Sequence, residues 1–217
     1  MKKPTFTSQL FPVTGLLLCG LLLAACNQKT PAPSNTVTTI KPTHVNGNGH
    51  DQLLTAGLDK SPMDMVYYPI DYPKLKMSRN ITEPLVARVI YSRPQKGGRT
   101  IFGEVLPYGH AWRMGANEAT EIEFFRDVTI NKQTVPKGRY VLYGIPYEDK
   151  WTIVLNSDLF TWGLKIDSSK DAFQFTIPIR KTNYPFEIFT MEFEKATKGM
   201  QLVMEWDSVQ AKLPILF

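Results

Sequence analysis

Apolar and polar residues alternate along most of the chain after residue 84, with the period of two that is typical of β-strands. In the segment 121–130, one face carries apolar residues and the other carries acids and threonine. Similar short runs, separated by turn residues, recur over residues 85–91, 134–135, 139–145, 151–155, 173–179, 186–193, 201–206 and 209–217. About nine short strands in this arrangement predict an all-β fold, a single antiparallel β-sandwich or barrel-like domain.

The segment 61–80 has a different character, because apolar and aromatic residues are mixed with Pro69 and Pro73. Proline fixes φ and lacks a backbone donor, so this density of proline excludes a regular helix. We predict an extended segment packed along the domain, with an exposed apolar patch as the alternative. Elsewhere the pattern has no helical period apart from a turn near Leu159 to Leu164.

The beginning of the chain has the layout of a bacterial export signal. Its first three residues give a positive start, and the uncharged apolar stretch that follows is too short to span a bilayer. That stretch ends in Leu-Ala-Ala-Cys at residues 23–26, which resembles the lipobox of bacterial lipoproteins. We therefore expect residues 1–25 to be a cleaved signal peptide and Cys26 to carry lipid. An ordinary signal peptide with an incidental cysteine is the alternative.

The chain after the signal divides into two parts. Residues 26–60 are rich in asparagine, threonine, proline and glycine, which predicts a lipidated, flexible tether. Residues 61–217 are predicted to form one domain, long enough to bury its own core. Cys19 would leave with the signal and Cys26 would be consumed by lipid, so no disulfide or thiol chemistry is expected.

The net charge of +5 falls by two when Lys2 and Lys3 leave with the signal. A balance this mild does not indicate a nucleic-acid partner. The expected partner is the membrane, reached through the lipid, and the oligomeric state stays open. No acidic run follows Cys26, and such a run resembles the surface-export signal of some Gram-negative lipoproteins. We therefore expect an anchor in a Gram-negative-type cell envelope, on the outer membrane and facing the periplasm.

The strand pattern breaks over residues 92–119, and a loop of this length is often functional. Arginine offers a planar fork for carboxylate or phosphate and stacks on aromatic rings, so Trp112 beside Arg113 would supply a platform. We predict a site for a small polar or anionic ligand, such as a glycan fragment, formed by Arg93, Arg99, Trp112, Arg113, Asn117 and Glu118. The alternative is that the arginines pair with Glu104 and Glu118 and only hold the loop together.

Several blocks of the chain resemble the DUF2911 family. They include Tyr91-Ser92-Arg93-Pro94, Lys96-Gly97-Gly98-Arg99, Trp112-Arg113-Met114-Gly115-Ala116-Asn117-Glu118-Ala119-Thr120, Lys137-Gly138-Arg139-Tyr140 and Trp162-Gly163. The resemblance covers roughly residues 61–217. It implies a domain of unknown function that is commonly exported and often lipid-anchored in Gram-negative envelopes. It implies no particular reaction or catalytic set.

Enzymatic activity stays open. Glu104 and Glu118 are the kind of carboxylate pair that a glycoside hydrolase needs on the two sides of the scissile bond. His110 would need a serine such as Ser92 and an acid to form a triad, and the sequence has no Gly-x-Ser-x-Gly elbow. A structural or interaction module with no small-molecule site is the third possibility.

We expect no metal centre and no cofactor. Two histidines and an aspartate occur at residues 44–51, but the asparagine and glycine between them fix no ligand geometry. Trp151 and Trp206 lie in or beside predicted strands and are expected in the core. Trp162 lies in a loop, where its indole would help to line a pocket with Asn156 as a polar partner.

Overall fold

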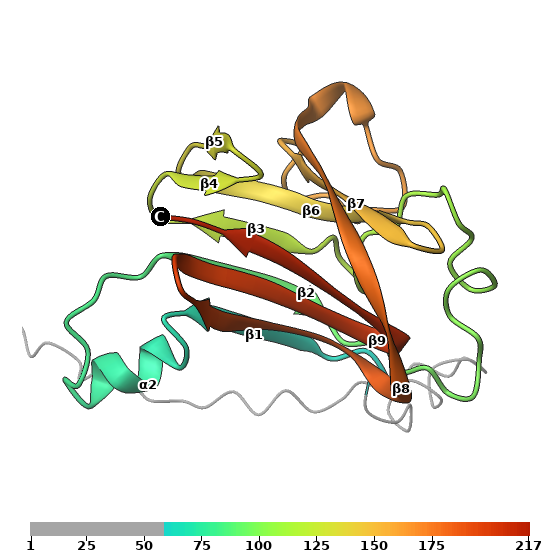
Figure 1. The fold of residues 1–217 in the computed structure, drawn as a ribbon, viewed down its shortest axis with the longest axis horizontal. Helices are drawn as coiled ribbons and strands as arrows, with labels where there is room; N and C mark the ends of the chain where they lie inside the picture. The colour runs from blue at the N-terminus through green and yellow to red at the C-terminus, as the bar shows by residue number, and fades with distance from the viewer. Residues whose placement is uncertain (1–58) are drawn as a thin grey trace, which may run out of the picture. The chain divides into compact units, whose positions relative to one another are not determined.

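The alternating segments join into one antiparallel sheet with the strand order β1-β2-β3-β6-β7-β8-β9 (Figure 1). The computed structural model describes residues 59–217, so the predicted signal peptide, Cys26 and nearly all of the tether lie outside the described residues. The strands are β1 Met63–Tyr68, β2 Ala87–Ser92, β3 Glu121–Phe124, β4 Val128–Ile130, β5 Gln133–Val135, β6 Gly138–Pro146, β7 Lys150–Asn156, β8 Asp171–Ala196 and β9 Gly199–Ile215.

The seven-stranded sheet curls into a half-barrel, and β4 and β5 form a small second sheet. The long strands β8 and β9 pass in front of β1 and β2 (Figure 1). Tyr91 of β2 joins the two layers, because its hydroxyl donates to the Met191 carbonyl at 3.2 Å and accepts from the Met191 N–H at 2.9 Å. The prediction of an all-β, antiparallel, barrel-like domain is confirmed.

Two boundaries differ from the prediction. The segment 121–130 is two strands, β3 and β4, because exposed residues at 125–127 interrupt it, although its apolar face is buried as expected. The four predicted strands after residue 172 are only two, β8 and β9. The pairing of β8 with β9 shifts register between Lys181 and Phe186, so a bulge replaces the predicted break. Asp207, with a φ of 50°, lies at the other predicted break.

The exclusion of a helix from residues 61–80 is wrong. The first part is extended, since β1 pairs with β2, but α2 follows at Tyr72–Met77. Pro73 lies in the first turn of α2, where its missing N–H has no intrahelical partner to lose. A second short helical element, the 3-10 turn η1 at Ser168–Lys170, follows the predicted turn near Leu159.

An aromatic cluster fills the centre of the core. Trp112 stacks on Trp206 of β9 with ring centroids 5.7 Å apart and contacts Phe189 of β8 edge-on at 4.9 Å. Trp151 of β7 lies 5.8 Å from Trp112, and Phe102 packs against both rings. Core positions for Trp151 and Trp206 are therefore confirmed. All of these residues lie in the described part of the chain, which thus holds its own hydrophobic core.

The loop between β2 and β3 covers one end of this core. It has no helix or strand of its own, as predicted, but Ile101 and Met114 within it are fully buried. Trp112 and Gly144 of β6 exchange two backbone hydrogen bonds of 2.7 and 2.9 Å. Asp207 accepts a hydrogen bond from the Ile101 N–H at 3.1 Å. These contacts make the loop an ordered part of the domain.

Gly199 begins β9 with a φ of +97°, where a Cβ would lie 2.3 Å from the Ile215 carbonyl oxygen. Gly199→Ala is expected to lower the free energy of unfolding by at least about 2 kcal/mol, because left-handed backbone strains an alanine and paired backbone atoms cannot move away. Gly97→Ala is the matched control, since Gly97 also has a positive φ but nothing within 4 Å. Equal losses in urea denaturation would contradict the clash.

Candidate ligand-binding cleft

A cleft of about 340 Å³ opens where the loop before β3 meets the loop after β7. Its walls come from β1, β2, β3 and these two loops. The lining residues are Met63, Ile90, Glu118, Ala119, Glu121, Phe160, Thr161 and Trp162. The cleft therefore combines two carboxylates with two aromatic rings, and it lies at the lower end of the size range of small-molecule sites.

The two loops are in direct contact beside the cleft. Gly163 has a φ of +76°, and a Cβ there would lie 2.9 Å from the Cβ of Arg113 and 3.0 Å from the Cβ of Ala119. Arg113 donates from Nη1 to the Trp162 carbonyl at 2.9 Å. The Ala119 N–H donates to the Thr161 carbonyl at 3.3 Å. Only glycine permits this approach, so Gly163 sets the position of Trp162 relative to Glu118.

Phe160 and Trp162 form an exposed aromatic shelf on one side of the cleft. Their exposed fractions are 82% and 55%, although large aromatic side chains are normally buried. Phe160 has a φ of +60°, a conformation that is unfavourable for a residue with a bulky side chain. The guanidinium carbon of Arg113 lies 6.0 Å from the Trp162 ring, and that of Arg139 lies 5.8 Å from the Phe160 ring. Each ring therefore already has a cation beside it.

The two carboxylates differ in their surroundings. Glu121 is partly buried, lies 3.7 Å from Arg139, and accepts a hydrogen bond from the Phe160 N–H at 3.4 Å. Glu118 is exposed, and no side chain or N–H of residues 59–217 donates a hydrogen bond to it. Glu121 therefore helps to position the shelf, while Glu118 is available to accept hydrogen bonds from a ligand.

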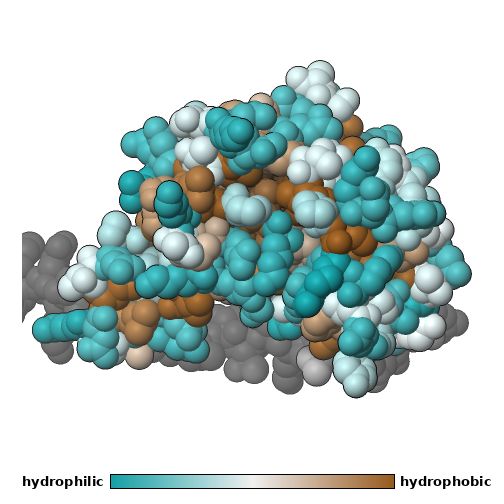
Figure 2. Space-filling model, viewed as in Figure 1, coloured by the Kyte–Doolittle hydropathy of each residue, from teal (hydrophilic) through white to brown (hydrophobic). Residues whose placement is uncertain are grey.

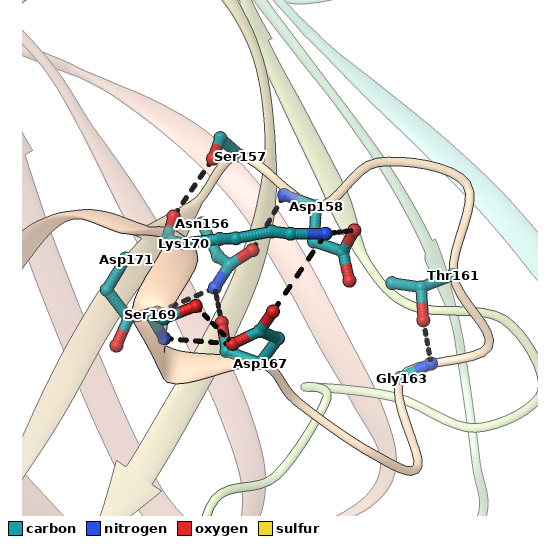
Figure 3. A network of polar contacts seen from close by, with 9 residues as sticks. All are labelled: Asn156, Ser157, Asp158, Thr161, Gly163, Asp167, Ser169, Lys170 and Asp171. Carbon is teal, nitrogen blue, oxygen red and sulfur yellow. Dashed lines mark hydrogen bonds and ion pairs between the residues drawn. The ribbon is translucent and has the colours of Figure 1, made fainter.

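A polar network holds the loop that carries the shelf (Figure 3). Asn156, the last residue of β7 and 1% exposed, donates to the Asp167 carbonyl at 2.8 Å and to Asp171 at 2.7 Å. The side-chain amide oxygen of Asn156 accepts from the Asp158 N–H at 2.7 Å. Burial and a hydrogen bond to Asp171 raise the pKa of the Tyr143 hydroxyl well above its usual value, so this donor stays protonated. The network joins the two ends of the loop.

Asn156→Ala is expected to lower the free energy of unfolding by about 1–3 kcal/mol, because it removes the hydrogen-bond partner of one Asp171 oxygen, of the Asp167 carbonyl and of the Asp158 N–H. Chemical denaturation measures the loss. Asn183→Ala, at an exposed asparagine of β8, is the control and is expected to change stability by less than about 0.5 kcal/mol. A loss no larger than that of the control would contradict a structural role for the network.

The predicted ligand residues are only partly brought together. Arg93 lies 3.1 Å from Asp64 and donates to the Thr190 hydroxyl. Arg99 donates to the carbonyls of its own turn, those of Lys96 and Gln95. Neither arginine is among the residues that line the cleft. Trp112 is 6% exposed in the aromatic cluster, and its indole N–H donates to the Gly115 carbonyl at 3.3 Å. The expected platform of Trp112 and Arg113 is therefore absent.

Of the predicted residues, Glu118 lines the cleft, and Arg113 and Asn117 make hydrogen bonds beside it. Arg113 supports Trp162 from behind, and Glu118 lines the wall. Asn117 donates to Asp59 at 2.9 Å and to the Ser61 carbonyl at 3.0 Å, which fixes the start of the domain beside the site. The pocket-lining position predicted for Trp162 is confirmed, whereas Asn156 lies beneath the loop and does not line the cleft.

The other predicted combinations lie apart from the cleft or lack a partner. Glu104 does not line it, so the second carboxylate beside Glu118 is Glu121 and not Glu104. Ser92 is fully buried and its hydroxyl donates to the Met63 sulfur, whereas His110 is exposed. The prediction missed Met63, Ile90, Glu121 and Phe160. The alternation of Phe160 and Trp162 with polar residues in a loop was the available signal.

No three histidine, cysteine, aspartate or glutamate residues within 59–217 are grouped as metal ligands. No helix in the same range is long and apolar enough to cross a membrane.

Comparison with known proteins gives one match. The family model described as "Protein of unknown function (DUF2911)" matches residues 73–215, which include every strand from β2 to β9 and the cleft residues except Met63. No curated protein and no solved structure matches the chain. The family model spans well over half of the sequence, and the chain belongs to the DUF2911 family.

Proposed function

We propose that the chain is a lipid-anchored binding protein of the bacterial envelope that holds a small neutral saccharide in the cleft beside Trp162. The observation that carries this proposal is the exposed shelf of Phe160 and Trp162 next to the exposed carboxylate of Glu118, which accepts no hydrogen bond from residues 59–217. Aromatic faces bind the apolar side of a flat ligand, and a carboxylate accepts hydrogen bonds from hydroxyl groups. A sugar ring offers both kinds of surface.

Charge argues against an anionic ligand in this cleft. Glu118 and Glu121 both line it, and like charges repel where the solvent is partly excluded. The arginines that would attract an anion are engaged elsewhere, Arg93 with Asp64 and Arg99 with backbone carbonyls. A carboxylate or phosphate ligand would therefore find no open arginine fork among the lining residues.

The arginines behind the shelf argue against a cationic ligand as well. An organic cation binds to an aromatic ring through the negative face of the ring. The rings of Trp162 and Phe160 already have the guanidinium groups of Arg113 and Arg139 within about 6 Å. A second cation on these rings would be repelled by the first, so a neutral polyhydroxylated ligand fits best.

Thermal-shift measurements on the chain expressed from residue 27 test the proposal. A bound ligand raises the melting temperature by mass action. Neutral mono- and disaccharides are expected to raise it, whereas sugar phosphates and choline at equal concentration are expected to have no effect. Stabilisation by the phosphates or by choline alone, or by none of the three classes, would contradict the proposal.

The anchor is proposed from the sequence at residues 23–26. Cys26→Ser is expected to remove all labelling by an alkyne fatty acid in a Gram-negative host and to leave the uncleaved precursor, because the thiol is the site of lipid attachment. Gel mobility and click detection measure both effects. Cys19→Ser is the matched control and should be labelled and processed like the parent. Labelling that persists in Cys26→Ser would exclude this anchor.

A further inference from the structure

The end of the domain at α2 carries apolar side chains without a covering partner in the described structure. No residue of α2 is buried, and Met77 within it is 82% exposed. Beside the helix, a groove of about 360 Å³ is lined mainly by apolar residues, among them Met65, Ile70 and Phe193. Figure 2 shows a group of apolar side chains at the lower left, where α2 lies in Figure 1.

Basic residues surround this apolar surface. Lys74, Lys76 and Arg79 lie in α2 or just after it and are exposed, against two acids, Asp71, which pairs with Lys74 at 3.1 Å, and Glu192, which lines the groove. A second pocket continues the surface from Tyr68 to the turn between β8 and β9, and Arg126 and Lys195 line it together with one acid. The surface is thus apolar in the middle, and its five bases exceed the three acids beside them, Asp71, Glu83 and Glu192.

We propose that this α2 end rests on an anionic lipid bilayer. A surface that combines protruding apolar side chains with lysine and arginine binds at the level of the lipid headgroups, where the bases meet lipid phosphates and the apolar groups enter the acyl boundary. The charge complementarity selects a bilayer over a second copy of the chain, because two copies of a basic surface would repel each other.

The proposed contact would place the ligand cleft away from the membrane. β1 begins at Met63, which lines the cleft, whereas its residues from Met65 to Tyr68 line the pockets at α2, so the cleft lies at the start of the strand and α2 lies beyond its last residue. A strand of this length spans roughly 17 Å at about 3.3 Å per residue. The number of residues from 27 to 58 allows this orientation. At about 3.3 Å per residue, an extended chain of this many residues would be several times longer than β1.

Vesicle sedimentation of the chain expressed from residue 27 tests the contact without any lipid anchor, and its outcome is therefore independent of Cys26 and of the ligand. The parent is expected to bind vesicles of phosphatidylglycerol and phosphatidylcholine, to bind pure phosphatidylcholine weakly, and to dissociate at high salt. The triple variant Lys74→Glu, Lys76→Glu, Arg79→Glu is expected to lower the partition coefficient about a hundredfold.

A matched triple variant separates the proposed surface from net charge. Lys150→Glu, Arg180→Glu, Lys181→Glu reverses three exposed bases of β7 and β8 and is expected to bind nearly as well as the parent. Met77→Ser tests the apolar part without any change of charge and should also weaken binding. Melting curves verify that each variant is folded. Absence of parent binding to anionic vesicles, or equal losses in the two triple variants, would overturn the proposal.

Discussion

Trp112→Ala is expected to lower the free energy of unfolding by about 3–5 kcal/mol, the range measured for large aromatic residues removed from protein cores. The indole is 6% exposed and contacts four other aromatic rings, those of Phe102, Trp151, Phe189 and Trp206. Its removal would leave a cavity at the centre of the core and free the Gly115 carbonyl. Urea denaturation followed by circular dichroism measures the change.

The control for this variant is a second tryptophan, Trp162, which has the opposite role. Trp162→Ala is expected to change stability by less than about 0.5 kcal/mol, because the ring is more than half exposed. Similar stability losses in the two variants would contradict the separation of a core tryptophan from a ligand tryptophan. A stable Trp112→Ala protein that no longer binds the ligand would instead support the site at Trp112 and Arg113 that was predicted from the sequence.

Trp162→Ala is expected to weaken saccharide binding by about 2 kcal/mol, or roughly thirtyfold in Kd, as for a buried aromatic anchor in an interface. The ring supplies one face of the cleft, and no other tryptophan lines it. Isothermal titration with the saccharide that raises the melting temperature most measures the change. The stability of the variant separates lost contacts from lost folding.

Tyr184→Ala is the matched control, since Tyr184 is an aromatic residue of β8 that is 83% exposed and does not line the cleft. It is expected to bind the saccharide with the affinity of the parent. Glu118→Gln should weaken binding less than Trp162→Ala, because an amide still accepts one hydrogen bond. Unchanged saccharide affinity in Trp162→Ala would contradict the proposal that the shelf of Phe160 and Trp162 contacts the ligand.

Much of the fold follows from local pattern, because a sheet with one buried face requires the period of two. The side chains of Ile122, Phe124, Val128 and Ile130 were predicted on one apolar face for this reason, and all four are buried. The length of β8 was not predictable, because the bulge between Lys181 and Phe186 interrupts alternation without ending the strand. The helix α2 was hidden by Pro73, which is unfavourable inside a helix and acceptable in its first turn.

The candidate site was harder to predict, because its members are chosen by tertiary contacts. Arg93 and Arg99 looked equivalent to Arg113 in the sequence. What each arginine does depends on the residues that it contacts in the folded domain. Arg93 pairs with Asp64, which lies on a different strand, and this contact cannot be read from the sequence. Glu121 resembles a solvated residue of an alternating strand, and only the approach of Phe160 turns it toward a cleft. Gly163 permits the loop after β7 to approach Arg113 and Ala119, and the amino-acid composition of the loop does not reveal this constraint.

The most direct test of the proposed cleft is a crystal structure of the chain from residue 27 bound to the most stabilising saccharide. A sugar ring is expected against the face of Trp162, with a hydroxyl group donating to Glu118 and no contact with Arg93 or Arg99. A ligand bound at those two arginines, or anywhere outside the cleft between Met63 and Trp162, would contradict it.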